Sequence, residues 1–157
     1  MWAIGLELAL LTDDPWKVLM TTDHPNGGPY VNYPMVMTML MSQKRREKEM
    51  AKIAEKTFER TSIAGIDREL DWYDIAIKTR AAHAKVQGII ELGKGHLGVG
   101  ADADIAIYDI KPDETDATME FDKVEAAFRH AAYTIKGGEI VVKDGEITAV
   151  PRAEPTG

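Results

Sequence analysis

The sequence predicts an α/β protein, and three observations carry this prediction. Good helix formers fill three long stretches, at residues 2–11, 34–60 and 71–86. A short apolar run bounded by turn residues, 17–22, is typical of a buried strand. Three short β runs separated by "KGG" and "KDG" fill residues 133–150, as in an antiparallel meander. A chain of 157 residues suffices for one ordinary domain with its own core.

The three helical stretches differ in what their side chains predict. Residues 2–11 are apolar almost all round, with Glu7 as the lone charge, which predicts a helix buried against a large neighbour. In the second stretch Pro34 suits the first helical turn, and the methionines are expected to pack in a core rather than to line a cofactor site. The third helix is expected to begin after an Asp71 cap and to stop at Gly88.

Between the third helix and the meander, the sequence predicts a glycine-rich connector, a strand at 105–110, an acidic loop at 111–116 and a helix at 121–131. Glycines 93, 95 and 98 of the connector satisfy the G-x-G-x-x-G pattern of dinucleotide-binding proteins. That fingerprint must follow a strand and open a helix, whereas here it follows a helix and enters a strand. These glycines are therefore interpreted as turn residues.

The net charge, the cysteine content and the apolar runs of the sequence argue against several classes of function. A net charge of −7 without a basic stripe argues against nucleic-acid binding, which needs clustered Lys and Arg. The absence of cysteine from the sequence excludes disulfides, thiolate zinc sites and iron–sulfur ligation from this chain. No apolar run approaches the roughly 20 residues that span a bilayer, and the first residues lack a secretory signal pattern. A cytoplasmic protein is expected.

The stretch "TTDHPNGGP", residues 21–29, places Asp23 and His24 between the apolar run and a Gly/Pro-rich loop. It is either a surface turn, which its residue types explain, or the rim of an active site. Neighbouring side chains on an extended chain point in opposite directions, so the pair is not expected to bind one metal ion together. The other histidines show no zinc-ligand spacing, and the chain by itself presents no evident zinc site.

Longer runs resemble the amidohydrolase superfamily. "RAAHAKVQGIIELGKGHLGVGADADIAIYDI" resembles the segment after that family's last barrel helix, "YTIKGGEIVVKDGEI" its closing strands, and "KVLMTTDHPNGGP" its eighth barrel strand and loop. The resemblance implies the C-terminal part of a metal-dependent hydrolase (β/α)₈ barrel, with its last strand and helices, at residues 1–90. A small C-terminal β domain at 91–150 and a tail at 151–157 would follow. The family's H-x-H, bridging lysine and further histidines are missing, which indicates a fragment.

More narrowly, "GLELALLTDDPWKVLMTTDHPNGGPYVNYP" resembles the family of hydrolase-like subunits of formylmethanofuran dehydrogenases. The resemblance implies a binuclear-zinc amidohydrolase that forms or cleaves the N-formyl bond between formate and methanofuran. Asp23 would be a metal ligand and the catalytic proton shuttle, while His24 and Asn26 would either order the substrate or only shape the turn. Partner subunits of this complex of one-carbon metabolism and methanogenesis would hold a molybdenum or tungsten pterin and iron–sulfur clusters.

Two alternatives remain open at this point: a cyclic amidohydrolase of the dihydroorotase or hydantoinase kind, or an assembly domain without activity. His83 stands where the amidohydrolase family often has a proline, which implies a packing role rather than a metal ligand. The isolated fragment is expected to be inactive and to self-associate, because a strand and an apolar helix would lack their barrel neighbours.

Overall fold

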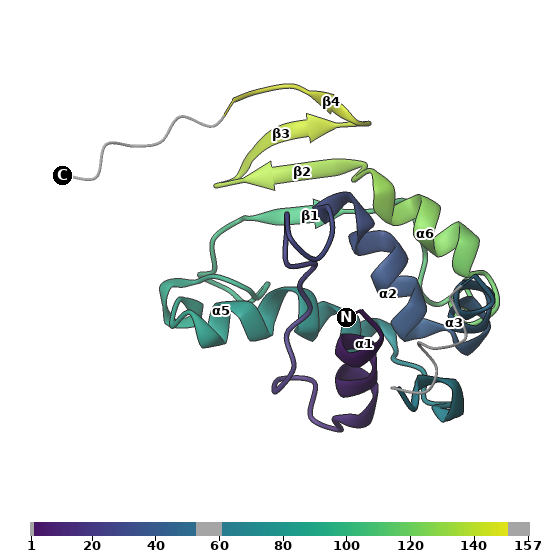
Figure 1. Cartoon of the computed structure of the whole chain (residues 1–157). Coiled ribbons are helices and arrows are strands. Elements are labelled where there is room, and N and C mark those ends of the chain that lie inside the picture. The colour runs from purple at the N-terminus through teal and green to yellow at the C-terminus, as the bar shows by residue number, and fades with distance from the viewer. Residues whose placement is uncertain (1, 53–60, 151–157) are drawn as a thin grey trace.

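The computed structural model describes residues 2–52 and 61–150, in which a group of helices lies against one small antiparallel sheet (Figure 1). The helices are α1 (Trp2–Leu11), α2 (Tyr33–Met41), α3 (Gln43–Met50), α4 (Trp72–Ala76), the π-helical segment η4 (Ile77–Ala81), α5 (Ala82–Val86) and α6 (Phe121–Arg129). Short 3₁₀ turns are η1 (Tyr30–Asn32), η3 (Ile63–Gly65) and η5 (Ile90–Leu92). The strands are β1 (Ile105–Ile107), β2 (Tyr133–Lys136), β3 (Glu139–Lys143) and β4 (Glu146–Ile147). None of the described helices is long and apolar enough to cross a membrane.

The sheet confirms the predicted meander. Its strand order is β1-β2-β3-β4, every neighbouring pair is antiparallel, and Ile105 lies opposite Ile135. The "KGG" and "KDG" sequences form the two tight connections, where Asp144 takes the positive φ that such turns require. The predicted strand at 105–110 is shorter than expected, because β1 ends at Ile107.

The core lies mainly between α1, α2 and α6. The buried side chains of Leu10, Leu40, Met41 and Val124 have at most 1% of their surface exposed. Met37 and Met39 are buried in the same cluster and Met35 packs against it, so the prediction that these methionines serve packing is confirmed. A smaller cluster joins the segment before residue 20 to the third predicted helix, and comprises Trp16, Leu19, Ile77, Ala81 and Ala82.

The predicted strand at 17–22 is wrong, because this segment has bends at residues 17 and 18 and no regular secondary structure. Its backbone bonds to a helical stretch instead of a strand: the Met20 N–H donates to the Lys78 carbonyl at 3.1 Å, and the Met20 carbonyl lies 2.9 Å from Nε2 of His83. A strand needs a neighbouring strand to complete its ladder. All the strands that the structure describes belong to the β1–β4 sheet, which does not include this segment.

The long helix predicted at 34–60 is interrupted at Ser42, whose φ of −139° and ψ of 120° are extended. Ser42 accepts a hydrogen bond from the Arg45 N–H at 3.1 Å and donates one to the carbonyl of Thr118 at 2.7 Å. A serine in this position caps a new helix rather than continuing the old one. The stretch is therefore two helices, α2 and α3, and residues 53–60 of the predicted helix lie outside the described residues.

The third predicted helix is confirmed over residues 72–86, including both of its ends. The Asp71 side chain accepts from the Asp74 N–H at 2.8 Å in a capping box. At the other end Gly88 takes a φ of 69°, and its N–H bonds to the Lys85 carbonyl at 3.1 Å. The predicted helix at 121–131 is also present, as α6, and ends two residues earlier than expected.

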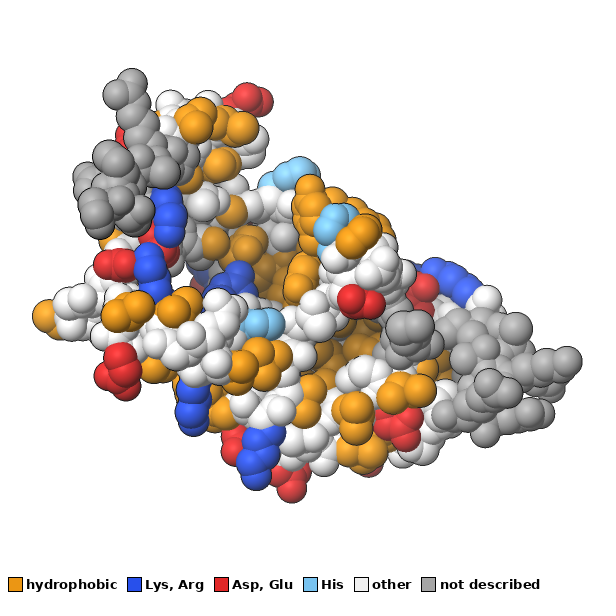
Figure 2. Space-filling model, turned by 60° about the vertical axis from the view of Figure 1, so that its left-hand side comes forward, with side chains coloured by type: hydrophobic (Ala, Val, Ile, Leu, Met, Phe, Trp, Pro, Cys, Tyr) orange, Lys and Arg blue, Asp and Glu red, His pale blue; other side chains and the backbone are white. Residues whose placement is uncertain are grey.

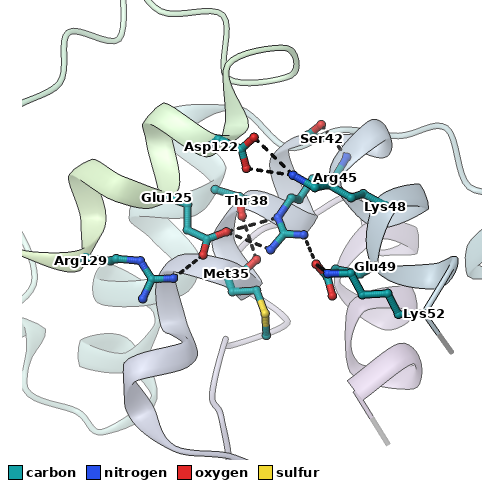
Figure 3. A network of polar contacts seen from close by, with 10 residues as sticks. All are labelled: Met35, Thr38, Ser42, Arg45, Lys48, Glu49, Lys52, Asp122, Glu125 and Arg129. Atoms are coloured by element: carbon teal, nitrogen blue, oxygen red, sulfur yellow. Dashed lines mark hydrogen bonds and ion pairs between the residues drawn. The ribbon is translucent and has the colours of Figure 1, made fainter.

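A partly buried ion-pair network joins α3 to α6 (Figure 3). Nη2 and Nε of Arg45 donate to the same Glu125 carboxylate oxygen at 3.0 and 3.3 Å, and Arg45 also pairs with Glu49 of its own helix. The side chains of Arg45 and Glu125 are 7% and 13% exposed. Burial alone would lower the pKa of Arg45, but the hydrogen bonds to Glu49 and Glu125 raise it above its ordinary value. The pair fixes α6 against the rest of the helices.

Candidate functional site around Asp23

Asp23 follows a segment that is held in place by the helix at residues 72–86. Both backbone groups of Met20 bond to that helix, through the Lys78 carbonyl and the His83 ring. Trp16 and Leu19 pack against its apolar side chains. The position of the loop that begins at Asp23 is therefore set by a rigid element far along the chain.

The loop itself is a tight turn. Asp23 has a φ of +51°, a conformation that Asp and Asn tolerate better than most residues. Its N–H donates to the Thr21 hydroxyl at 3.1 Å, and its carbonyl accepts from the Gly27 N–H at 2.7 Å. The peptide bond between His24 and Pro25 is cis. The turn leaves the Asp23 side chain exposed to solvent.

Gly27 is the residue that the turn requires. A Cβ at this position would lie 2.8 Å from the carbonyl oxygen of Thr22 and 2.9 Å from the Cβ of Asp23, closer than real contacts allow. The first of these neighbours is backbone, so it cannot move aside without moving the turn. The glycine thus allows the chain to close tightly beside the Asp23 side chain.

His24 and Asn26, the two residues that would order the substrate, do not bond to the Asp23 side chain in the part of the chain that the structure describes. The His24 ring makes an edge contact with the Tyr30 ring, with centroids 4.9 Å apart, and Asn26 is exposed in the turn. Of the other histidines, His83 bonds to Met20 as described, and His96 accepts from the Gly98 N–H at 3.1 Å. Both rings bond to backbone groups, and for His83 this agrees with the expected packing role.

Within residues 2–52 and 61–150, no group of three or more His, Cys, Asp or Glu side chains is arranged to hold a metal ion. Asp23 is a ligand type that zinc accepts, but a zinc site needs three or four protein ligands. The described residues therefore do not fit a zinc centre by themselves, and Asp23 could supply only one ligand to a site completed elsewhere.

A cavity of about 280 Å³ opens beside Asp23. Asp23, Gly27 and Thr22 line one part of it, and residues of α1, α2 and segment 18–20 supply a mostly apolar wall. Lys78 also lines this cavity and is only 1% exposed. Sequence reasoning missed Lys78, although a signal was present: it lies three residues after Ile75 and four before Ala82, on the apolar face of its helix.

Large hydrophobic side chains also reach the surface. Figure 2 shows one face of the molecule, on which hydrophobic side chains lie at the surface and gather in a hollow near its centre. On α1 the side chains of Ile4, Leu8 and Leu11 are 54–60% exposed, although the opposite side of the same helix is buried. A helix that is apolar all round is typical of one covered on every side.

Comparison with known proteins agrees with the resemblance found in the sequence. Protein FwdA of Methanocaldococcus jannaschii is 54% identical over 147 residues, and FhcA, of the formyltransferase/hydrolase complex Fhc of Methylorubrum extorquens, is 41% identical over 148 residues. These matches cover 93% and 94% of this chain but only 25% of each relative. The chain thus spans about a quarter of the length of these relatives.

A solved structure and a family model complete the comparison. The crystal structure of the formyltransferase/hydrolase complex (FhcABCD) from Methylorubrum extorquens in complex with methylofuran contains a similar chain, with a TM-score of 0.81 and 40% identity. That match covers 94% of this chain and 25% of the other. The model of the amidohydrolase family matches residues 4–142, which include the Asp23 turn, the helices and most of the sheet. This chain therefore belongs to the amidohydrolase family.

Proposed function

We propose that this chain is the C-terminal part of the hydrolase-like subunit of a formylmethanofuran dehydrogenase or of a related formyltransferase/hydrolase complex, located in the cytoplasm. The support is the 54% and 41% identity to FwdA and FhcA together with the family match. Residues 1–90 would be the end of the barrel and 91–150 its small β domain.

The reaction we propose is the formation or cleavage of the N-formyl bond between formate and methanofuran. The observation that carries it is the place of Asp23, at an anchored turn beside a cavity. In the direction of hydrolysis, a carboxylate oxygen of Asp23 takes the proton of the attacking water and then gives it to the departing amine nitrogen. In the opposite direction the same oxygen carries the proton back.

The binuclear zinc centre is part of the proposal for the longer protein only. Asp23 would be one of its ligands, and the others would come from residues outside this chain. Zinc ions in such a site would polarise the carbonyl oxygen and acidify bound water. The pterin and iron–sulfur cofactors would belong to partner subunits, and this chain, which contains no cysteine, would supply no thiolate to them. This chain would supply the Asp23 carboxylate that transfers the proton, and the turn that holds it.

The experiment uses a chimera in which this chain replaces the matched quarter of Methanocaldococcus jannaschii FwdA, to which it is 54% identical. In this chimera Asp23→Asn keeps the shape of the side chain but removes its ability to accept a proton. We expect formyl hydrolysis to fall by about 10²–10⁴ while bound zinc falls only in part. The matched control is Asp144→Asn, because Asp144 has the same φ of 51° and lies in a hairpin turn of the sheet.

If Asp23 only shaped its turn, both substitutions would leave the activity unchanged, because Asn suits a left-handed turn as well as Asp does. Normal formyl hydrolysis in a folded, zinc-loaded Asp23→Asn chimera would remove Asp23 from the reaction. Hydrolysis of a dihydropyrimidine or hydantoin ring, without cleavage of an N-formyl amine, would instead favour the cyclic amidohydrolase alternative.

A further inference from the structure

Lys78 carries an ammonium group that is buried beside the Asp23 cavity. Its side chain is 1% exposed, and its Nζ atom has no hydrogen-bond partner among the described residues. Burial lowers the pKa of Lys78, and the more distant charges of Asp74 and Asp14 only partly oppose this effect. A buried charge without a partner is strongly unfavourable, and proteins pair such groups almost without exception.

Lys78 does not face a closed interior. It lines the cavity of about 280 Å³, whose other walls are mostly apolar side chains of α1, α2 and segment 18–20. A group that entered this cavity would meet apolar surface first and an unpaired positive charge beyond it. An acidic side chain carried on an apolar surface has the matching chemistry.

The outer side of α1 borders the same cavity. Leu6 and Ala9 line the cavity and are buried, while Leu8 also lines it and remains 57% exposed. Ile4 and Leu11 extend the exposed apolar surface along the helix. The cavity and this side of α1, which we call the α1 face, form one continuous apolar area that holds the single buried charge of Lys78.

The α1 face belongs to a chain that is much shorter than its relatives. The chain matches 25% of each curated relative and 25% of the solved Fhc chain, so three quarters of those proteins lie outside it. We propose that the α1 face is the docking surface for this remaining part of the polypeptide, and that a carboxylate from that part enters the cavity and pairs with Lys78. The proposal rests on the proposed place of this chain in a longer protein, but not on the proposed reaction.

Lys78→Met tests the proposal because it is expected to raise the melting temperature of the isolated chain and to lower that of the chimera. Methionine keeps the length of the side chain and removes its charge. In the 157-residue chain the substitution removes an unpaired buried charge, so the melting temperature should rise by several degrees. In the chimera with FwdA it leaves a buried carboxylate unpaired, so the melting temperature should fall by several degrees. Lys85→Met, at an exposed position of the same helical stretch, loses only a cation–π contact with the Trp16 ring and should lower the melting temperature slightly and equally in the chain and in the chimera.

A second measurement does not depend on the chimera. The 157-residue chain is mixed with a polypeptide that contains the other three quarters of FwdA, and binding is followed by calorimetry. We expect binding that Lys78→Met weakens at least about tenfold, which corresponds to the loss of one charge pair, and that Lys85→Met leaves unchanged.

A rise in melting temperature in both the chain and the chimera would overturn the carboxylate pairing. Failure of both the chimera and the mixture to assemble would overturn the docking surface itself. If a carboxylate of a second copy of this chain, and not one from the remaining part of the polypeptide, paired with Lys78, the effect of Lys78→Met would depend on the concentration of the chain alone, which would also contradict the proposal. The effect of Lys78→Met is measured as stability and binding, so it can be absent while formyl hydrolysis and its dependence on Asp23 are present. Formyl hydrolysis can equally be absent while the effect of Lys78→Met is present.

Discussion

Replacing Glu125 by Gln tests how strongly the ion-pair network holds α6 to α3. Glu125 accepts two hydrogen bonds from Arg45, and both side chains are largely buried. Removing one partner of a fully buried pair costs about 3–5 kcal/mol. Here Arg45 keeps Glu49, and glutamine keeps an oxygen that can accept a hydrogen bond. The substitution also removes the pair of Glu125 with Arg129, which is 54% exposed and therefore adds little. We therefore expect a smaller loss, about 1–3 kcal/mol in the free energy of unfolding.

Thermal unfolding followed by circular dichroism measures this loss. For a chain of this length 1 kcal/mol corresponds to about 2–4 °C, so Glu125→Gln should lower the melting temperature by about 2–12 °C. Asp122→Asn is the matched control on the same helix. Asp122 is 72% exposed and lies 3.4 Å from Lys48, which is itself 52% exposed, so its loss should stay within about 0.5 kcal/mol.

A double-mutant cycle separates the contact from other effects of the substitution. Arg45→Met and Glu125→Gln together should destabilise the chain by clearly less than the sum of the two single changes, because each single change leaves a charge behind. Equal melting temperatures for Glu125→Gln and Asp122→Asn, or strictly additive losses in the cycle, would refute the argument that this pair holds α6 in place.

Further predictions concern the turn, the connector, association and metal content. Gly27→Ala should shift or open the Asp23 turn, because the new Cβ would lie 2.8 Å from a backbone oxygen; amide NMR shifts confined to residues 21–29 would confirm this, and an unchanged spectrum would contradict it. Hydrogen bonds from Lys136, Lys94 and Gly137 hold the pKa of Asp104 well below its usual range, so its stabilisation is present above about pH 4 and is lost as the pH falls. The stability difference between the native chain and Asp104→Asn should accordingly shrink in acid, and a difference that is constant with pH would exclude this role. The isolated chain should self-associate through the α1 face, and Leu8→Asp should reduce the mass seen by light scattering; a concentrated monomer before the substitution would count against it. Elemental analysis of the isolated chain should find no pair of tightly bound zinc ions, and two per chain would disprove the expectation that the centre needs residues from elsewhere.

The elements that sequence reasoning placed correctly are those with local causes. Both ends of the third helix were predicted because Asp71 and Gly88 cap it through contacts with residues close to them in the sequence. The meander was predicted because its glycine turns determine where each strand ends. In both cases the structure depends on neighbours in the sequence.

The elements that were missed depend on distant contacts. The break at Ser42 comes with a hydrogen bond to Thr118, 76 residues further along the chain, and the run around it is otherwise rich in helix formers. The apolar run at 17–22 has the composition of a strand, but a strand also needs a neighbouring strand to bond to, and composition does not show whether one is present. In this chain Met20 bonds to Lys78 and His83 instead.

The candidate site was predictable only in part. The turn residues around Asp23 were evident from the sequence, but their anchoring through Met20 was not, because it depends on a helix more than 50 residues away. Lys78 was missed because a lysine in a helix is usually solvated, and only its position among Ile75 and Ala82 suggested burial.

The bonds at Met20 have a consequence for protein engineering. Because both its N–H and its carbonyl are held by the helical stretch at 72–86, the Asp23 turn and that stretch form a single transplantable module, joined by contacts instead of by continuous sequence. A graft of residues 17–29 alone onto another scaffold would carry the right residues without the part that positions them. A graft that carries both pieces in their mutual arrangement could dispense with the intervening chain and still present Asp23 in the same place.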